Sequence, residues 1–200
     1  MDISQVRWAL EHATRPSRGA AVMIPLVREG AGLSVLLEVR AQTLAVQPGE
    51  VCLPGGGIEE DESPLDAAIR ETCEELLVRP SQLDILGSLG AQDGPGGCSL
   101  YAYVASLVGY EGTFSPAEVD QTFTIPLDYL IENAPTTYRV TYEPHFPDDF
   151  PWALVPGGPA YRWRVRPSDV PFYQGTDPLI WGATARVLAR FAALLANTAQ

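Results

Sequence analysis

The sequence contains no lysine, so all 13 of its basic residues are arginines, set against 25 acidic residues. The formal net charge is −12 at pH 7. Nucleic-acid backbones bind to basic surfaces, so this balance argues against a nucleic-acid partner. A small polyanionic substrate meets the same repulsion at long range, but bound divalent cations cancel it locally because they are the largest charges in such a site.

Other signals are scarce or missing. Cysteine occurs three times without a CxxC pair, which favours reduced thiols in a cytoplasmic protein. No apolar run approaches membrane-spanning length, and the N-terminus lacks the pattern of a secretory signal. The two histidines, His12 and His145, lie in no motif. We therefore expect a cytoplasmic protein without a membrane partner, whose chemistry does not depend on histidine.

The length and composition suit one domain over residues 1–200, because 200 residues with 46% hydrophobic content can bury a real core. Alternating or continuous apolar patterns predict strands and helices in mixed order, which favours an α/β fold with a sheet between helices. The predicted strands are residues 19–27, 33–40, 83–89, 100–108 and 121–125. The predicted helices are a short one from Pro64, one over 127–132 and a closing one over 181–195.

The most informative stretch joins a glycine-rich loop to the helix that begins at Pro64. Ser63 is a good N-cap, and proline suits the first helical position. Each residue of a helix is rotated by about 100° from the one before it. This rotation places three glutamates, Glu71, Glu74 and Glu75, on the face opposite the apolar stripe. Such carboxylates repel one another unless a hard divalent cation binds them, so they predict a magnesium or manganese site. The alternative is a solvated acidic face.

The spacing of this stretch resembles the signature of the Nudix hydrolases, which cleave a diphosphate linked to another group. The matching residues are Gly56, Glu62, Arg70, Glu71, Glu74 and Glu75. The resemblance implies a Nudix fold, an α/β/α sandwich around a mixed β-sheet. It also implies that the metal is held by the three helix glutamates together with a backbone carbonyl near Gly56.

Two residues of the helix depart from the Nudix pattern. Thr72 stands where a bulky aliphatic residue is usual, and Leu77 replaces the glycine that normally ends the helix. Because glycine there serves as a C-cap, its loss predicts a different helix exit, with Pro80 stopping the helix.

Residues outside the three helix glutamates complete the predicted site. Glu62 is expected to orient Arg70, which also braces Glu74. Glu118 is a candidate general base or additional metal ligand, or else a glutamate that only begins a helical turn; Asp93 is a weaker candidate. The expected substrate contacts are Arg40, Gly55, Gly56 and Arg70.

The resemblance extends in pieces to the coenzyme A pyrophosphatase subgroup, through residues 36–37, 49, 54–56, 116–119, 125–127 and 180–185. The subgroup's two threonines correspond to Glu38 and Arg40, and its arginine to Ala45. The first expected substrate is therefore coenzyme A or an acyl derivative, with Arg40 as a possible replacement for the missing arginine. The alternatives are an ADP-ribose or nucleotide-sugar pyrophosphatase and a catalytically silent nucleotide-binding module. The enzyme is expected to be a monomer or a homodimer.

Residues 142–175 form a segment near the C-terminus that is rich in proline and aromatic residues. It is too aromatic to be disordered. One interpretation is a lid or wall that stacks on a nucleobase; the other is an inserted hairpin that packs its aromatics on the core. Arg162, Arg164 and Arg166 within it are candidates for binding the 3′-phosphate of coenzyme A.

Overall fold

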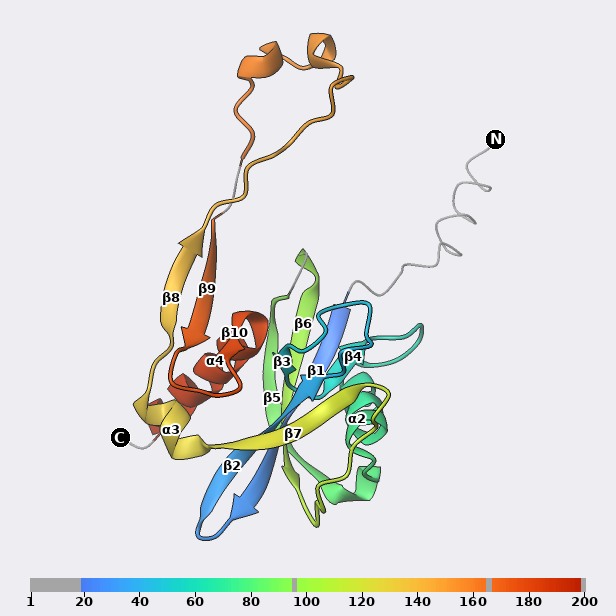
Figure 1. The fold of residues 1–200 in the computed structure, drawn as a ribbon, viewed down its shortest axis with the longest axis vertical. Helices are drawn as coiled ribbons and strands as arrows, with labels where there is room; N and C mark the ends of the chain where they lie inside the picture. Colours follow the sequence, from blue (N-terminus) through green and yellow to red (C-terminus); the bar gives the residue numbers. More distant parts are fainter. Residues whose placement is uncertain (1–18, 95–96, 165–166, 199–200) are drawn as a thin grey trace.

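The computed structural model describes residues 19–94, 97–164 and 167–198. The predicted phosphate contact Arg166 lies outside these residues. Figure 1 shows the elements, which along the first half of the chain are β1 (Gly19–Glu29), β2 (Gly32–Arg40), β3 (Val51–Cys52), β4 (Gly55–Gly57), α2 (Pro64–Leu76), η1 (Pro80–Gln82), β5 (Leu83–Asp93) and β6 (Ser99–Leu107). The second half contains β7 (Val119–Pro126), α3 (Leu127–Glu132), β8 (Thr136–Val140), η3 (Trp152–Leu154), η4 (Gly158–Ala160), β9 (Ser168–Tyr173), β10 (Ile180–Trp181) and α4 (Gly182–Thr198).

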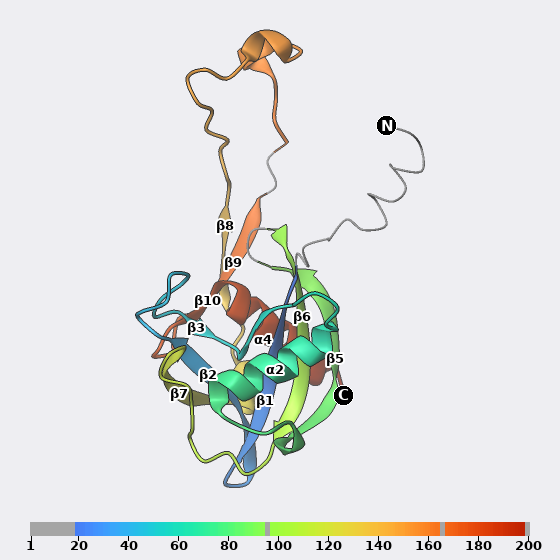
Figure 2. The ribbon, with the colours of Figure 1, turned by 90° about the vertical axis from the view of Figure 1, so that its right-hand side faces the viewer.

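A seven-stranded mixed sheet forms the centre of the molecule, in the order β3-β2-β1-β6-β5, with β4 paired to β1 and β7 paired to β2. Strands β1 and β6 are parallel, whereas the other pairs in this sheet are antiparallel. Apolar side chains alternate between the two faces. Met23 and Leu36 pack with α2, while their neighbours Ile24 and Leu37 pack with α4 on the other face. Figure 2 shows α2 in front of the sheet and α4 behind it, so the α/β/α sandwich is confirmed.

The sheet forks where the site is built. Strand β1 pairs with β2 only over Leu26–Glu29, and at its other end it pairs with β4 through Ala20–Val22. The far end of β2 pairs with β3, with Glu38 opposite Cys52. The glycine-rich stretch before α2, which the sequence predicts to be a loop, contains these two short strands, because the separated edges of β1 and β2 leave backbone groups for it to pair with. The fork brings the glycines of β4 against α2.

The predicted segment 142–175 belongs partly to the body and partly to an arm. Strands β8, β9 and β10 form a second sheet, in which Tyr173 is buried and Phe172 stacks on Trp181 at 5.5 Å between ring centroids. Both ribbon views show an arm, residues 141–164, extending away from the body (Figures 1 and 2). The rings in the arm pack on one another, as with Phe146 and Trp152 at 4.7 Å. The expectation of aromatics packed on the core is therefore right for β9 and wrong for the arm.

In the described part of the chain, no helix is long and apolar enough to cross a membrane.

Candidate active site

The start of α2 forms as its sequence predicts. The Ser63 hydroxyl accepts a hydrogen bond from the Asp66 amide at 3.2 Å and donates one to the Asp66 carboxylate at 2.6 Å. Proline at the first position lacks the amide hydrogen that would otherwise be unsatisfied there. The cap fixes where the helix begins, and therefore which residues face the glycines of β4.

Three carboxylates converge beside this helix. One oxygen each of Glu71, Glu75 and Glu118 lies within 4.8 Å of the others. Glu118 comes from the turn before β7, where its carbonyl accepts a hydrogen bond from the Ala41 amide at 2.9 Å. This turn is thereby fixed to the end of β2. Hard oxygen donors in such a group fit Mg²⁺ or Mn²⁺.

The glycines of β4 fit closely against these carboxylates. The Gly55 amide donates a hydrogen bond to Glu75 Oε2 at 2.8 Å. A Cβ added at Gly56 would lie 2.5 Å from the carboxylate carbon of Glu71. At Gly55 an added Cβ would lie 2.2 Å from the Ala21 carbonyl oxygen. Only glycine lets the backbone lie this close to α2 at Gly56 and to β1 at Gly55. The contact of both glycines with substrate or metal stays a prediction.

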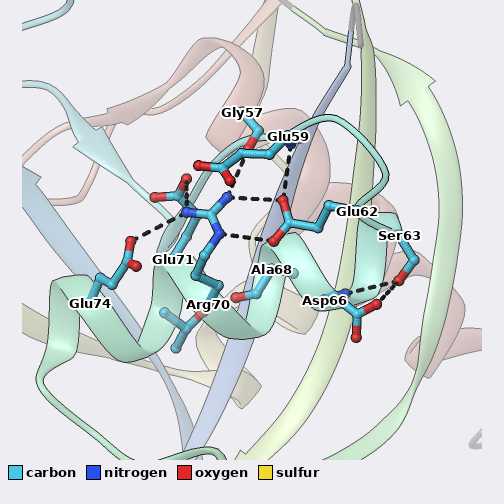
Figure 3. Close-up of polar contacts among 10 residues, drawn as sticks. Gly57, Glu59, Glu62, Ser63, Asp66, Ala68, Arg70, Glu71 and Glu74 are labelled. Carbon is cyan, nitrogen blue, oxygen red and sulfur yellow. Dashed lines mark hydrogen bonds and ion pairs between the residues drawn. The ribbon is translucent and has the colours of Figure 1, made fainter.

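Arg70 holds the site together from the outside (Figure 3). Its Nε and Nη2 donate to the two oxygens of Glu62 at 2.8 and 3.0 Å, which confirms that Glu62 orients it. Nη1 donates to Glu71 at 2.8 Å and to Glu74 at 3.3 Å, and Nη2 also donates to the Gly57 carbonyl at 3.1 Å. These contacts engage all five guanidinium hydrogens. In this structure Arg70 therefore positions Glu62, Glu71 and the Gly57 carbonyl, and its contact with substrate stays a prediction.

Glu74 lies apart from the converging group, contrary to the expectation that it joins Glu71 and Glu75. Its side chain is 55% exposed and forms an ion pair with Arg70. As the next residue along α2, the buried Glu75 points about 100° away from Glu74 around the helix axis. Glu118 takes the third place in the group. Helix spacing alone does not predict that Glu74 is exposed and Glu75 buried, because it carries no information about the loop that packs against α2.

Burial dominates the electrostatics of the group. It raises the pKa of Glu75 to about 9, with the charge of Glu38 as the next cause. Burial also raises the pKa of Glu71, against the opposing effect of the hydrogen bond from Arg70. Outside the group, hydrogen bonding from Arg70 lowers the pKa of Glu62 to about 2. Because its pKa is raised to about 9, Glu75 favours its protonated form when no cation is bound, and a divalent ion at this group would compete with that proton.

Sequence reasoning missed a fourth carboxylate. Glu38 on β2 is fully buried, and its Oε1 accepts a hydrogen bond from the Cys52 thiol at 3.2 Å. Burial raises the pKa of Glu38 to about 7 and also raises that of Cys52. The available signal was a single charge inside an apolar strand, Leu36-Leu37-Glu38-Val39.

Arg40 lies two residues further along the same strand. Its Nε donates to the Val46 carbonyl at 3.2 Å, and its charge lowers the pKa of Glu38 against the larger effect of burial. For the two Nη groups we find no hydrogen bond within the part of the chain that the structure covers. Its role as a phosphate contact stays a prediction.

The exit of α2 differs from the predicted one. The helix ends at Leu76, and Leu77 adopts the left-handed backbone, with φ of 53°, that glycine normally adopts at this position. The prediction that loss of the glycine changes the exit is therefore wrong. The helix end is fixed by tertiary contacts: Thr113 Oγ1 donates to the Leu76 carbonyl at 2.7 Å, and the Ser115 amide donates to the Glu75 carbonyl at 2.7 Å.

A cavity of about 630 Å³ lies on the α2 side of the sheet, between the ends of β1 and β6 and strands β2 and β7. None of the four carboxylates lines it. Tyr110, in its wall, donates a hydrogen bond to the Thr113 carbonyl at 2.7 Å, and its hydroxyl oxygen lies 3.2 Å from the Thr122 hydroxyl, from which it accepts. Burial raises the pKa of Tyr110, and the charge of Glu38 contributes to the rise. Tyr110 is therefore the lining residue on which the charge of Glu38 acts. The apolar part of the lining is Val27, Leu33, Leu36, Leu107, Val108 and Phe123.

The NUDIX domain family matches residues 17–158, which is more than half of the chain. The chain therefore belongs to the Nudix family.

Several curated proteins resemble the chain. Nudix hydrolase 3 of Caenorhabditis elegans is 35% identical over 122 residues, covering 58% of this chain and 51% of that protein. The peroxisomal coenzyme A diphosphatase NUDT7 of Mus musculus is 32% identical over 117 residues, covering 56% and 48%. The chain thus matches only about half the length of these two relatives. A Nudix hydrolase of Photorhabdus laumondii, NudL, is 29% identical over 178 residues, covering 88% and 84%.

A crystal structure of a MutT/nudix family protein from Enterococcus faecalis has a TM-score of 0.50 and 16% identity, covering 95% of this chain and 68% of that one. At this identity the likeness concerns the fold alone, and it agrees with the Nudix fold described above.

Proposed function

We propose that this chain is a single-domain pyrophosphohydrolase that depends on a divalent metal and cleaves the diphosphate of a nucleoside diphosphate linked to another group. The observation that carries the proposal is the convergence of Glu71, Glu75 and Glu118 on one point beside Gly55 and Gly56. When bound there, Mg²⁺ or Mn²⁺ neutralises phosphate oxygens that would otherwise repel a nucleophile.

Each residue of the site has a distinct role in this proposal. Glu71 and Glu75 hold the cation, and Glu118 serves as a further ligand or as the general base. Gly55 and Gly56 let phosphate oxygens approach the helix closely, while Arg40 supplies the cationic contact beside them. Arg70, whose donors are all engaged, keeps Glu71 and the loop in place. Glu74 contributes through Arg70.

Coenzyme A or an acyl-CoA is the substrate that we propose first. The mouse relative is named a coenzyme A diphosphatase, although the match covers only part of it. The cavity at the ends of β1 and β6 offers an apolar lining for a pantetheine arm. The rival substrates within the same chemistry are ADP-ribose and nucleotide sugars. Three free cysteines agree with a reducing, cytoplasmic location.

The test is a panel of coenzyme A, 3′-dephospho-coenzyme A, ADP-ribose, NADH, diadenosine polyphosphates and UDP-sugars, each with magnesium or manganese, with the products identified by mass. We expect coenzyme A to be cleaved to 3′,5′-ADP and phosphopantetheine, faster than the dephospho form by about 10-fold per good phosphate contact. Faster cleavage of ADP-ribose would reassign the substrate. No cleavage of any compound would contradict the enzyme itself.

Glu75→Gln tests the site in the same assay. It keeps the shape and removes a charge, so kcat should fall by about 100-fold or more, as when a strong electrostatic contact to the transition state is lost. Glu60→Gln, at the exposed tip of the same loop, is the matched control and should leave kcat unchanged. A folded Glu75→Gln protein with normal turnover would exclude this site.

A further inference from the structure

Strand β8 lies at the edge of the second sheet, whose order is β10-β9-β8. All five of its residues are exposed, and it pairs with β9 in a register without a bulge. Among the described residues, no strand pairs with its other edge. Natural edge strands often carry a proline, a lysine or a bulge that prevents further pairing. The sequence of β8, Thr-Thr-Tyr-Arg-Val, has none of these and consists mostly of residues that favour strands.

The register with β9 shows which backbone groups of β8 are free. Thr137 is opposite Pro171. Because proline has no amide hydrogen, these two residues cannot exchange both hydrogen bonds of a bonded antiparallel pair. The amide and carbonyl groups of Thr137, and of Arg139 two residues further on, therefore point to the free edge. This edge offers two donors and two acceptors to a further strand.

The outer face of the same sheet carries exposed apolar side chains. Tyr138 and Val140 are 50% and 38% exposed, and the ring of Tyr138 meets that of Phe172 edge-on at 5.6 Å between centroids. Phe172 in turn stacks on Trp181, which is 37% exposed. An apolar patch beside an unpaired strand edge is typical of a surface that binds a protein through strand addition.

Charge favours a second copy of this chain as the partner. Residues 136–173 contain four arginines and four acidic residues, so this segment is formally neutral in a chain of net charge −12. Two copies repel one another over the rest of their surface, but not here. The charge on Arg139 is paired within its own chain, with Nε 3.0 Å from Asp169 Oδ1. A nucleic acid or an anionic membrane would need an excess of positive charge that this segment lacks.

We propose that two copies of this chain form a dimer in which β8 pairs antiparallel with β8 of the partner across a twofold axis. A twofold interface joins the same surface of both copies, and an antiparallel strand can pair with its own copy in this way. Thr137 exchanges both hydrogen bonds with Arg139 of the partner subunit, and Tyr138 lies opposite its own copy at the axis. The inference goes beyond the proposed activity and does not depend on it.

The same axis gives the arm a surface to contact. The arm continues from the end of β8 (Figure 1), and antiparallel pairing places the start of the partner's β8, with α3 before it, beside that end. The exposed Tyr142, Leu154 and Trp163 of the arm then have a protein surface within reach. With 24 residues, the arm is as large as one side of a standard interface, about 20–30 residues. Each chain has its own core, so below the dissociation constant the Tm is that of one chain.

The oligomeric state tests the proposal directly. Light scattering after size exclusion should give twice the chain mass of 21.6 kDa for the wild type, with a dimer fraction that rises with concentration. Thr137→Pro removes an amide hydrogen from the free edge and spares the bonds to β9, so this variant should be monomeric. Val46→Glu is the control, because it adds a charge at a 64% exposed valine in the loop before β3 and should leave the dimer intact.

A charge exchange at Tyr138 distinguishes lost pairing from misfolding. Tyr138→Glu and Tyr138→Arg each place two like charges opposite one another at the axis, so each variant alone should be monomeric. Mixed in equal amounts, they place opposite charges there, and the dimer should return. A wild type that is monomeric at every concentration would overturn the proposal. So would folded Tyr138 variants that dimerise alone, or whose mixture stays monomeric, and none of these outcomes bears on the proposed activity.

Discussion

Leu77 adopts an unfavourable left-handed backbone conformation at the end of α2. A left-handed backbone costs a residue with a Cβ about 1–2 kcal/mol, and glycine avoids this cost. The side chain of Leu77 is 57% exposed, so little buried surface is lost on its removal. We expect Leu77→Gly to raise the free energy of unfolding by about 1 kcal/mol, measured by urea denaturation.

Leu194 is the matched control for this change, because it is a leucine of α4 with 53% exposure and a helical backbone. Glycine inside a helix is unfavourable by about 1 kcal/mol relative to alanine, so Leu194→Gly should destabilise the protein. A loss of stability in both variants would show that the side chain of Leu77 matters more than its backbone.

Gly56 and Gly57 are adjacent glycines with opposite tolerance for a side chain. A Cβ at Gly56 would lie 2.5 Å from the Glu71 carboxylate carbon, whereas a Cβ at Gly57 has no atom within 4 Å. Gly56→Ala should therefore displace Glu71 and weaken manganese affinity by about 10-fold or more, a cost of roughly 1.4 kcal/mol. Gly57→Ala should leave affinity unchanged, as measured by isothermal titration calorimetry. Equal affinities would mean that Glu71 is not a ligand.

At the level of elements, prediction succeeded where structure is local. The start of α2 follows from Ser63 and Pro64, whose effects act within one turn. Strands β3 and β4 were not predicted, because runs of two and three residues exist only through partners on β1 and β2 that are distant in sequence. Glu118 was named as a candidate from the sequence, and the structure brings it to Glu71 and Glu75. The burial of Glu38 depends on sheet pairing, which the helix motif does not encode.

The arm over residues 141–164 extends from the body, and we expect the body to fold without it. Its rings pack on one another, and its base is a hairpin in which Val140 pairs with Ser168. Replacing 141–167 by Asn-Gly joins these paired residues with a two-residue turn. We expect the shortened protein to unfold cooperatively with a Tm within about 3 °C of the full chain, since a surface change away from core contacts shifts stability by under about 0.5 kcal/mol.

The wild type is the reference for this deletion, and manganese binding is its second readout. Binding should be unchanged, because the converging carboxylates lie on α2 and on the turn before β7. A protein that loses its cooperative transition would show instead that the arm is part of the folding unit. A loss of metal binding with folding intact would place the arm in the site.

For the whole molecule, the acidic site couples stability to pH and metal. Burial raises the pKa of Glu75 to about 9 from 4.5, so the metal-free folded state binds more protons than the unfolded state between these values. Stability from this group is complete below pH 4.5 and is lost as pH rises toward 9. We expect the Tm of the metal-free protein to fall between pH 6 and pH 8.5, measured by calorimetry in EDTA.

Saturating manganese should reverse this trend. The ion competes with protons for Glu75, so its affinity rises with pH, and an ion that binds only the folded state stabilises it by mass action. The gain in Tm on adding the metal should therefore be larger at pH 8.5 than at pH 6. Glu75→Gln provides the control, because an amide does not titrate: its metal-free Tm should lose most of the fall with pH. A wild-type Tm that rises with pH in EDTA would show that Glu75 is ionised in the metal-free folded state. That result would contradict the raised pKa of Glu75.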